Sequence, residues 1–164
     1  MNKFTESELK GRNILKSFLD QVGATNQMPT EDEYNPVDYY FTYKEKKVVA
    51  EIKCRDIKYL NYPTHLMEVS KYNALMKDKQ NKQLDTAYYI NFFGENIAYW
   101  YSNSTIRKYA TEDIKYCNRT TAENRGRTNK SVLLIPTDKA QIFIRKNGIW
   151  SNGSLEEIRT FASN

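Results

Sequence analysis

The first amphipathic segment of the chain predicts a helix over residues 5–22. Thr5 and Glu8 have the spacing of a capping box, in which two side chains bond the free backbone N–H groups at a helix start. The apolar side chains that follow recur every three or four residues, and they are Leu9, Ile14, Leu15, Phe18, Leu19 and Val22. Gly23 is a suitable C-terminal stop, and the polar residues 24–35 are expected to form a loop.

Two segments with alternating polarity, 37–43 and 48–55, predict a β-hairpin. The apolar side chains expected on one face are Val37, Tyr39, Phe41 and Tyr43 in the first strand and Val48, Ala50, Ile52 and Cys54 in the second. A turn centred on Glu45 and Lys46 would place Asp38 opposite Lys53 and Tyr40 opposite Glu51.

The rest of the chain predicts a helix over 64–78, strands over 87–93, 97–101 and 132–135, and a C-terminal helix that opens at Ser154. This order predicts an α/β fold, with a mixed central β-sheet flanked by helices in a single domain spanning residues 1–164. The segment 118–131 is polar and basic, and it is expected to be a long loop, either functional or a disordered insertion.

Composition narrows the class of protein. The 164 residues are 40% hydrophobic, so the chain can bury a core without a disulfide or a structural metal. No run approaches the roughly 18 apolar residues that span a bilayer, and the first residues lack the apolar core of a signal peptide. Cys54 and Cys117 are too few for a disulfide framework or a zinc site. We therefore expect a cytoplasmic protein with no membrane partner.

Candidate chemistry lies in the hairpin. By the period of two, Asp38, Glu51 and Lys53 share the face opposite Val48, and they bring two carboxylates and one ammonium together. Carboxylate oxygens suit Mg²⁺ or Mn²⁺. The backbone carbonyl of Ile52 is expected between the two carboxylates, where it could donate a further ligand. Lys53 can steer an attacking water or offset charge that builds on a phosphate. Metal-assisted phosphodiester hydrolysis needs these parts.

A plain alternative explains the same residues. The tripeptide acid-x-Lys occurs five times in this chain, so the spacing of Glu51 and Lys53 means little without its setting in an apolar strand with an acid across the hairpin. The alternative is a half-exposed sheet face that carries a cross-strand ion pair, which contributes a few tenths of a kcal/mol. The physical pattern alone leaves both interpretations open.

A family resemblance favours the first interpretation. The run Asn35-Pro36-Val37-Asp38, followed after twelve residues by Glu51-Ile52-Lys53, resembles the signature of the PD-(D/E)XK nuclease superfamily, and residues 48–55 resemble the corresponding strand of Holliday-junction resolvases and restriction-type nucleases. The sequence departs from the pattern at Val37, which separates Pro36 from Asp38. The resemblance covers roughly residues 5–93.

The resemblance implies a restriction-endonuclease-like αβββαβ core and Mg²⁺-dependent cleavage that leaves a 5′-phosphate. It implies Asp38 and Glu51 as metal ligands and Lys53 as the catalytic lysine. Family members often add an acid from the first helix, for which Glu8 is the candidate and Glu6 the second choice, although Glu8 also completes the capping box. Many relatives dimerise, so the resemblance allows a homodimer.

Net charge adds a hint about the partner. The chain carries +5 at pH 7, which fits either a nucleic-acid partner or an ordinary solvated surface. The candidate phosphate-contact residues are Arg12, Arg55, Lys71, Arg119, Arg125, Arg127 and Lys130. His65 is the only histidine and is expected at the start of a helix, as a surface or capping residue.

The sequence thus predicts a Mg²⁺- or Mn²⁺-dependent endonuclease that acts on nucleic acid, in the first place DNA. The alternative is a protein of the same fold that has lost catalysis and binds nucleic acid or a protein partner. Descendants of that kind usually lose an acid or the lysine, and Asp38, Glu51 and Lys53 are all present.

Overall fold

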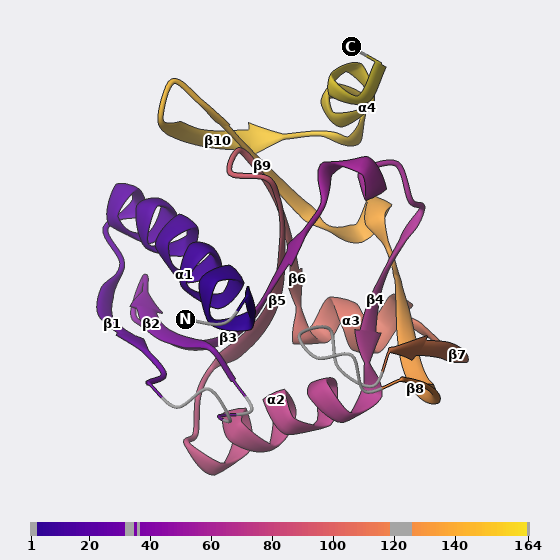
Figure 1. The fold of residues 1–164 in the computed structure, drawn as a ribbon. Coiled ribbons are helices and arrows are strands. Elements are labelled where there is room, and N and C mark those ends of the chain that lie inside the picture. The colour runs from indigo at the N-terminus through magenta and orange to yellow at the C-terminus, as the bar shows by residue number, and fades with distance from the viewer. Residues whose placement is uncertain (1–2, 32–34, 36, 119–125, 164) are drawn as a thin grey trace.

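The computed structural model describes residues 3–31, 35, 37–118 and 126–163. Figure 1 shows two β-sheets with helices packed around them. The larger sheet has seven strands in the order β1-β2-β3-β5-β6-β9-β10, and the smaller has three in the order β4-β8-β7. None of the helices in the described ranges is long and apolar enough to cross a membrane.

The first half of the chain forms an αβββαβ unit. Helix α1 (Lys3–Val22) is followed by strands β1 (Thr25–Pro29), β2 (Tyr39–Tyr43) and β3 (Lys46–Arg55), which pair antiparallel in that order. After the short strand β4 (Thr64–Glu68), helix α2 (Val69–Asn81) returns the chain to β5 (Thr86–Phe93), which pairs parallel with β3. The predicted α/β class, with a mixed central sheet flanked by helices, is confirmed.

The second half extends the large sheet and builds the small one. The strands are β6 (Ile97–Ser102), β7 (Thr111–Asn118), β8 (Arg127–Pro136), β9 (Gln141–Lys146) and β10 (Ile149–Gly153). The helices are α3 (Asn103–Tyr109) and α4 (Leu155–Ser163), and two short 3-10 turns lie at Ile57–Tyr59 and Thr137–Lys139. Ser154 caps α4 as predicted, since its hydroxyl accepts a hydrogen bond from the Glu157 N–H at 3.2 Å.

The predicted hairpin is present, but its predicted register is wrong by two residues. Lys44 and Glu45 both have positive φ, at 49° and 66°, which is the signature of a two-residue hairpin turn. The turn is therefore centred one residue earlier than expected, and Tyr39 pairs with Ala50. Asp38, just before the first paired residue, consequently contacts Ala50 and Ile52 of β3 and does not lie across from Lys53.

The two faces of the large sheet are buried under different elements. Helix α1 covers the face that carries Tyr39, Phe41, Val48 and Ala50. The other face, with Val49, packs in one core with Leu75 of α2 and with residues of β4 and β8. Val37 was predicted on the α1 face but lies in this second core, because regular pairing of β2 begins only at Tyr39. The single domain stays a prediction.

Three other expectations from the sequence are wrong. Residues 25–29 form edge strand β1, whose polar side chains gave no alternating pattern because the strand is largely exposed. The predicted helix 64–78 begins only at Val69, and residues 64–68 form β4, which pairs with β8. Of the predicted loop 118–131, residues 127–131 belong to β8 and Asn118 ends β7, while residues 119–125 lie outside the described residues.

One helix glycine allows α1 to lie directly on β3. A Cβ atom added to Gly11 would come 2.9 Å from Ile52 Cγ2 and 3.0 Å from Cys54 Sγ. These distances are shorter than normal van der Waals contacts of a Cβ atom. Any residue other than glycine at this position would therefore require α1 or the two side chains to move. Gly11 therefore sets how closely the helix approaches the strand that carries Glu51 and Lys53.

We expect Gly11→Ala to destabilise the protein, although alanine is the better helix former. The gain in helix propensity is up to about 1 kcal/mol, whereas overpacking typically costs about 1–3 kcal/mol, so a net loss near 1 kcal/mol is expected. Urea unfolding measures it. In an Ile52→Ala background, which removes one of the two crowded atoms, the same change should cost less, and an equal cost in both backgrounds would contradict this account.

His65 lies in the core and not at a helix start. Its side chain is almost completely buried in β4, and its Nδ1 shares a hydrogen bond of 2.8 Å with the Tyr101 hydroxyl. Burial, with a smaller contribution from nearby Arg55, lowers the pKa of His65 to about 3 from its ordinary 6.5. The prediction of a surface or capping histidine is therefore wrong.

The low pKa of His65 predicts a loss of stability on acidification. The unfolded chain binds a proton near pH 6.5 and the folded chain does so only near pH 3, so this contribution is complete above pH 6.5 and falls as the pH drops towards 3. The difference in unfolding free energy between wild type and His65→Asn should shrink by about 1.4 kcal/mol per pH unit below 6.5. Urea unfolding at pH 7, 6 and 5 tests this, and a constant difference would contradict it.

Candidate active site

Asp38 is held against the part of β3 that extends past the paired residues of the β2–β3 hairpin. Its backbone N–H donates to the Ala50 carbonyl at 3.1 Å, and one oxygen of its carboxylate accepts a hydrogen bond of 2.7 Å from the Ile52 N–H. The side chain therefore occupies the place that the next residue of a paired strand would take. This arrangement anchors one carboxylate oxygen and directs the group towards β3.

Glu51 lies beside Asp38, close enough for the charge of the Asp38 carboxylate to act on it. Burial raises the pKa of both groups, and that of Glu51 is raised well above its ordinary value because the Asp38 charge adds to the effect of burial. The two acids thus resist simultaneous ionisation, as neighbouring carboxylates in a shared site do. A cation between them would remove this repulsion.

The backbone at Ile52 adds a third oxygen to this place. In a strand, the N–H and C=O of one residue point to the same side, and the Ile52 N–H is bonded to Asp38. The Ile52 carbonyl therefore points to the edge of β3 at which Asp38 lies. Across the described residues no three His, Cys, Asp or Glu side chains gather at one point, so the donor set consists of two carboxylates and this carbonyl. Such hard oxygen donors fit Mg²⁺ or Mn²⁺.

Two lysines border the carboxyl pair. Lys71 of α2 places its ammonium 3.8 Å from a Glu51 oxygen, and its side chain is 50% exposed, whereas that of Glu51 is only 12% exposed. Lys53 is more enclosed, and burial together with the neighbouring charge of Arg55 lowers its pKa. Lys71 thus lies on the solvent-exposed side of the carboxyl pair, and Lys53 lies in a more buried position.

Glu68, the last residue of β4, counters the positive charge near Lys53. Its carboxylate attracts Lys53 and accepts a hydrogen bond of 2.8 Å from Lys130 of β8. The small sheet is therefore joined electrostatically to the neighbourhood of the carboxyl pair. The sequence did not single out Glu68, because only the split of the expected helix 64–78 into β4 and α2 brings it here.

Arg12 connects α1 to the segment before Asp38. Its guanidinium donates to a Glu8 carboxylate oxygen and to the Thr30 hydroxyl, each at 2.9 Å, and its charge lowers the pKa of Asp38 against the larger effect of burial. Thr30 in turn donates to the Val37 carbonyl at 2.8 Å. The sequence missed Thr30, since a single threonine in a polar segment carries no recognisable signal.

Glu8 does not cap the helix, because α1 begins at Lys3 and Glu8 is engaged with Arg12. The Arg12 guanidinium thus links Glu8 to the surroundings of Asp38, and the role of Glu8 as a metal ligand stays a prediction. Glu6, the second choice, lines a separate hollow on α1 together with Lys10.

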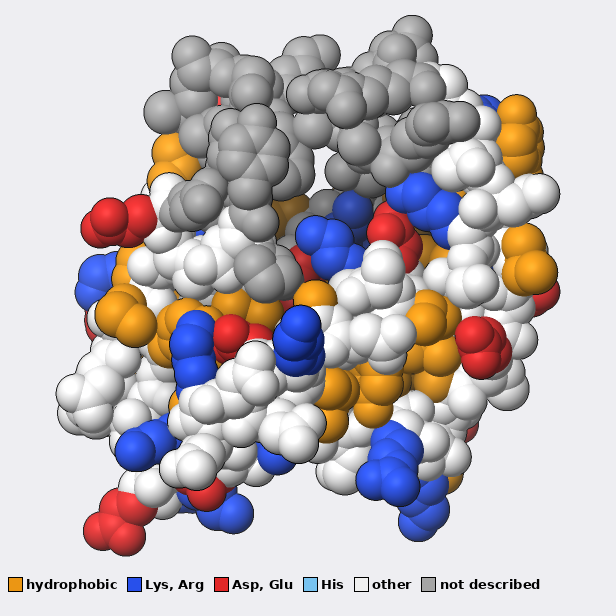
Figure 2. Space-filling view, turned by 90° about the horizontal axis from the view of Figure 1, so that it is seen from below, with side chains coloured by type: hydrophobic (Ala, Val, Ile, Leu, Met, Phe, Trp, Pro, Cys, Tyr) orange, Lys and Arg blue, Asp and Glu red, His pale blue; other side chains and the backbone are white. Residues whose placement is uncertain are grey.

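The predicted phosphate-contact residues are distributed unevenly. Arg55 turns inward, where it donates to Asn91, to the Leu66 carbonyl and to the Tyr89 hydroxyl. Arg127 lies over the Tyr116 ring at 4.8 Å. Arg119 and Arg125 lie outside the described residues. Figure 2 shows the molecule from below the view of Figure 1. On that side, Lys and Arg side chains are interspersed with Asp and Glu side chains around a hollow.

Comparisons with known proteins give a limited result. No protein-family model matches the chain, and no curated protein matches it. Among solved structures, it is similar to a Holliday junction resolvase, Hjc, from the archaeal hyperthermophile Archaeoglobus fulgidus. The TM-score is 0.46 and the identity 11%, and the match covers 73% of this chain and 84% of the resolvase. The function proposed below therefore depends on contacts within this chain.

The buried carboxyl pair predicts a stabilising substitution. Glu51→Gln removes the charge that burial and Asp38 disfavour, and it should raise the unfolding free energy at neutral pH by about 0.5–2 kcal/mol, measured in urea without divalent metal. The matched control is Glu68→Gln, which removes a carboxylate paired with Lys130 and should lower stability by up to about 1 kcal/mol. A loss of stability in Glu51→Gln would show that its charge is fully compensated.

Proposed function

We propose that the chain is a Mg²⁺- or Mn²⁺-dependent nuclease that hydrolyses phosphodiester bonds, with DNA as the substrate. The observation that carries this proposal is the pair of buried, adjacent carboxyls of Asp38 and Glu51, which lie beside the Ile52 carbonyl and face two lysines. Structural ion pairs rarely leave two acids next to each other, whereas sites that bind cations and phosphates do so.

Each residue has a distinct task in the proposed reaction. Asp38, Glu51 and the Ile52 carbonyl would hold the metal ion. When bound, such an ion supplies a Lewis acid for the phosphate and lowers the pKa of a coordinated water. Lys53 orients the attacking water and offsets negative charge on the scissile phosphate, and its enclosed position strengthens both effects. Arg12 is a positioning residue, because it acts on Asp38 through Thr30 and its own charge.

DNA is supported as the substrate by charge and by access. The chain carries +5 at pH 7, and partly exposed Lys71 stands beside Glu51, where an entering phosphate would pass. A phosphate contact at this place would make binding sensitive to salt. The form of the DNA (duplex, single strand or junction), and whether RNA is cut as well, are then outcomes of the test.

The test compares two lysines in the same tripeptide setting. Lys53→Met keeps the apolar stem and removes the ammonium, and it should lower cleavage by at least about 100-fold without loss of DNA affinity. Lys58→Met is the matched control, because Asp56 and Lys58 repeat the acid-x-Lys spacing at an exposed site, and it should cleave like wild type. The assay uses plasmid, linear duplex, single strand, four-way junction and RNA with Mg²⁺ or Mn²⁺.

Two results would contradict the proposal. Undiminished cleavage by Lys53→Met would remove Lys53 from the reaction. A folded wild type that binds DNA but cuts none of the five substrates with either metal would support instead the non-catalytic binding protein with the same fold.

A further inference from the structure

A second hollow lies on the opposite face of the large sheet from the carboxyl pair. It has a volume of about 440 Å³, within the range of small-molecule sites, and it is bounded by the second half of α1, the β2–β3 turn and strands β5, β6, β9 and β10. Val48 lines this hollow, whereas Val49 and Glu51 belong to the other face, so the hollow and the candidate active site are separated by the thickness of the sheet.

The wall of this hollow is aromatic. The Trp100 ring lies at its centre, with the centroids of Phe18, Tyr88 and Phe143 at 4.9, 5.2 and 5.9 Å. Tyr43, Tyr88 and Phe143 line the hollow and are only partly buried. Aromatic faces that remain accessible in a concave place favour stacking with another planar ring.

The described charged residues that line this hollow have one sign. Among them are Lys44 and Lys46 of the β2–β3 turn, and no described aspartate or glutamate lines it. The Lys44 ammonium lies 5.2 Å from the centroid of the Tyr43 ring, so a positive charge stands directly beside the aromatic wall. A ring that carries an anionic group would therefore find complementary charge at the rim.

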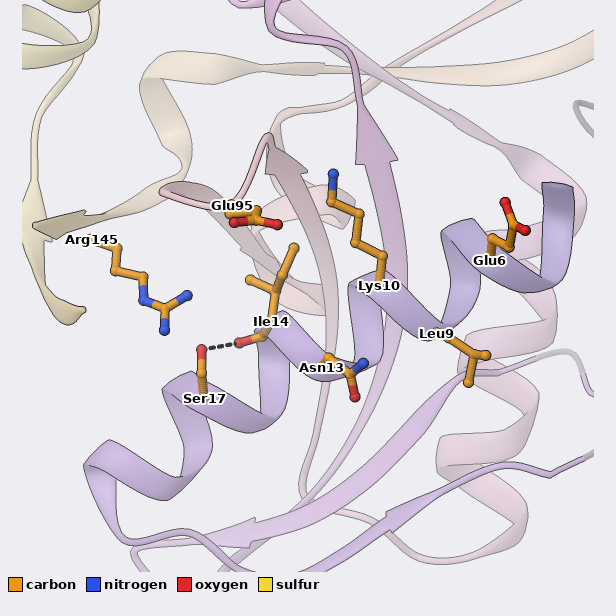
Figure 3. Close-up of a pocket in the computed structure, with 8 residues that line it drawn as sticks. All are labelled: Glu6, Leu9, Lys10, Asn13, Ile14, Ser17, Glu95 and Arg145. Carbon is orange, nitrogen blue, oxygen red and sulfur yellow. Dashed lines mark hydrogen bonds between the residues drawn. The ribbon is translucent and has the colours of Figure 1, made fainter. Parts of the chain in front are cut away.

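The hollow beside α1 provides a contrast. Figure 3 shows Glu6 and Glu95 among its lining residues together with Lys10 and Arg145. Its mixed charge and shallow form favour no particular ligand. The aromatic hollow differs from it in both respects.

We propose that the aromatic hollow binds a planar aromatic ring bearing a phosphate, of the size of a nucleoside monophosphate. The ring stacks against Tyr88 and Phe143, and the phosphate lies between Lys44 and Lys46. Thr86, Gln141 and Asn152 also line the hollow and offer polar groups to the ring edge. This site is independent of the candidate active site and does not require divalent metal.

The tryptophans allow a direct test. The chain has two, Trp100 and Trp150, and both line the hollow. Wild-type protein in EDTA is titrated with AMP, GMP, CMP and UMP, with the corresponding nucleosides and with inorganic phosphate, and binding is followed by tryptophan fluorescence and by calorimetry. At least one nucleotide should quench the fluorescence saturably, and its nucleoside should bind at least 10-fold more weakly.

Matched variants separate the proposed site from unspecific attraction. Lys44→Asn/Lys46→Gln should weaken nucleotide binding at least 10-fold, where asparagine is chosen because it tolerates the positive φ of Lys44. Lys58→Gln/Lys77→Gln changes the net charge equally at two exposed lysines that do not line the hollow and should bind like wild type. Lys53→Met should also bind normally, which distinguishes this site from the active site.

Three results would overturn the proposal. One is the absence of any nucleotide binding up to millimolar concentration. Another is equal weakening in both double variants, which would indicate general charge attraction. The third is self-association of the protein, measured by sedimentation, that Tyr88→Ala abolishes and nucleotides leave unchanged, because the hollow would then be an interface between two copies of the chain.

Discussion

The closeness of α1 to β3 is the constraint on which the arrangement of the candidate active site depends. Because Gly11 presents no side chain to Ile52 and Cys54, the helix lies against the C-terminal half of β3, the strand that carries Glu51 and Lys53. Arg12, the next residue of the helix, reaches the Thr30 hydroxyl and thereby the backbone just before Asp38. A wider spacing between helix and strand would leave this guanidinium, and with it the segment that positions Asp38, without its present contacts.

The large sheet separates buried charged side chains on one face from an aromatic core on the other. The two sets of side chains would be incompatible on a single face. The α2 face holds the buried carboxyls of Asp38 and Glu51 and the enclosed ammonium of Lys53, whose pKa values are shifted by burial and by neighbouring charges. The α1 face holds an aromatic core around Trp100. Period-two alternation along β3 accomplishes this separation, since Val48 and Ala50 face α1 while Glu51 and Lys53 face away. A polar site can thus coexist with a dry core only one residue away along the chain.

Much of the first half of the fold could be predicted from sequence, because its signals are local. The amphipathic stripe of α1, the hairpin and the Asp38, Glu51 and Lys53 constellation follow from periodicity and spacing. The predicted register of the hairpin was wrong because Lys44 and Glu45, which adopt positive φ in the turn, are not the Asn-Gly pair that usually marks such a turn in a sequence. Residues 64–68 were wrongly predicted as helix because β4 leads directly into α2, and its apolar residues continue the apolar spacing of that helix. Glu68 and Thr30 were missed because their positions depend on pairing between distant segments.

The side chain of Gln21 has a consequence for the order in which the structure is completed. Its amide accepts a hydrogen bond from the Trp150 N–H and donates one to the Trp150 carbonyl, both at 2.7 Å, as a neighbouring strand would at the edge of β10. These partners are 129 residues apart in the sequence. During synthesis from the N-terminus, the segments that carry Asp38, Glu51 and Lys71 emerge well before Trp150. The acidic segments can therefore come together before Trp150 is made, whereas the aromatic hollow is completed only after Trp150 has emerged.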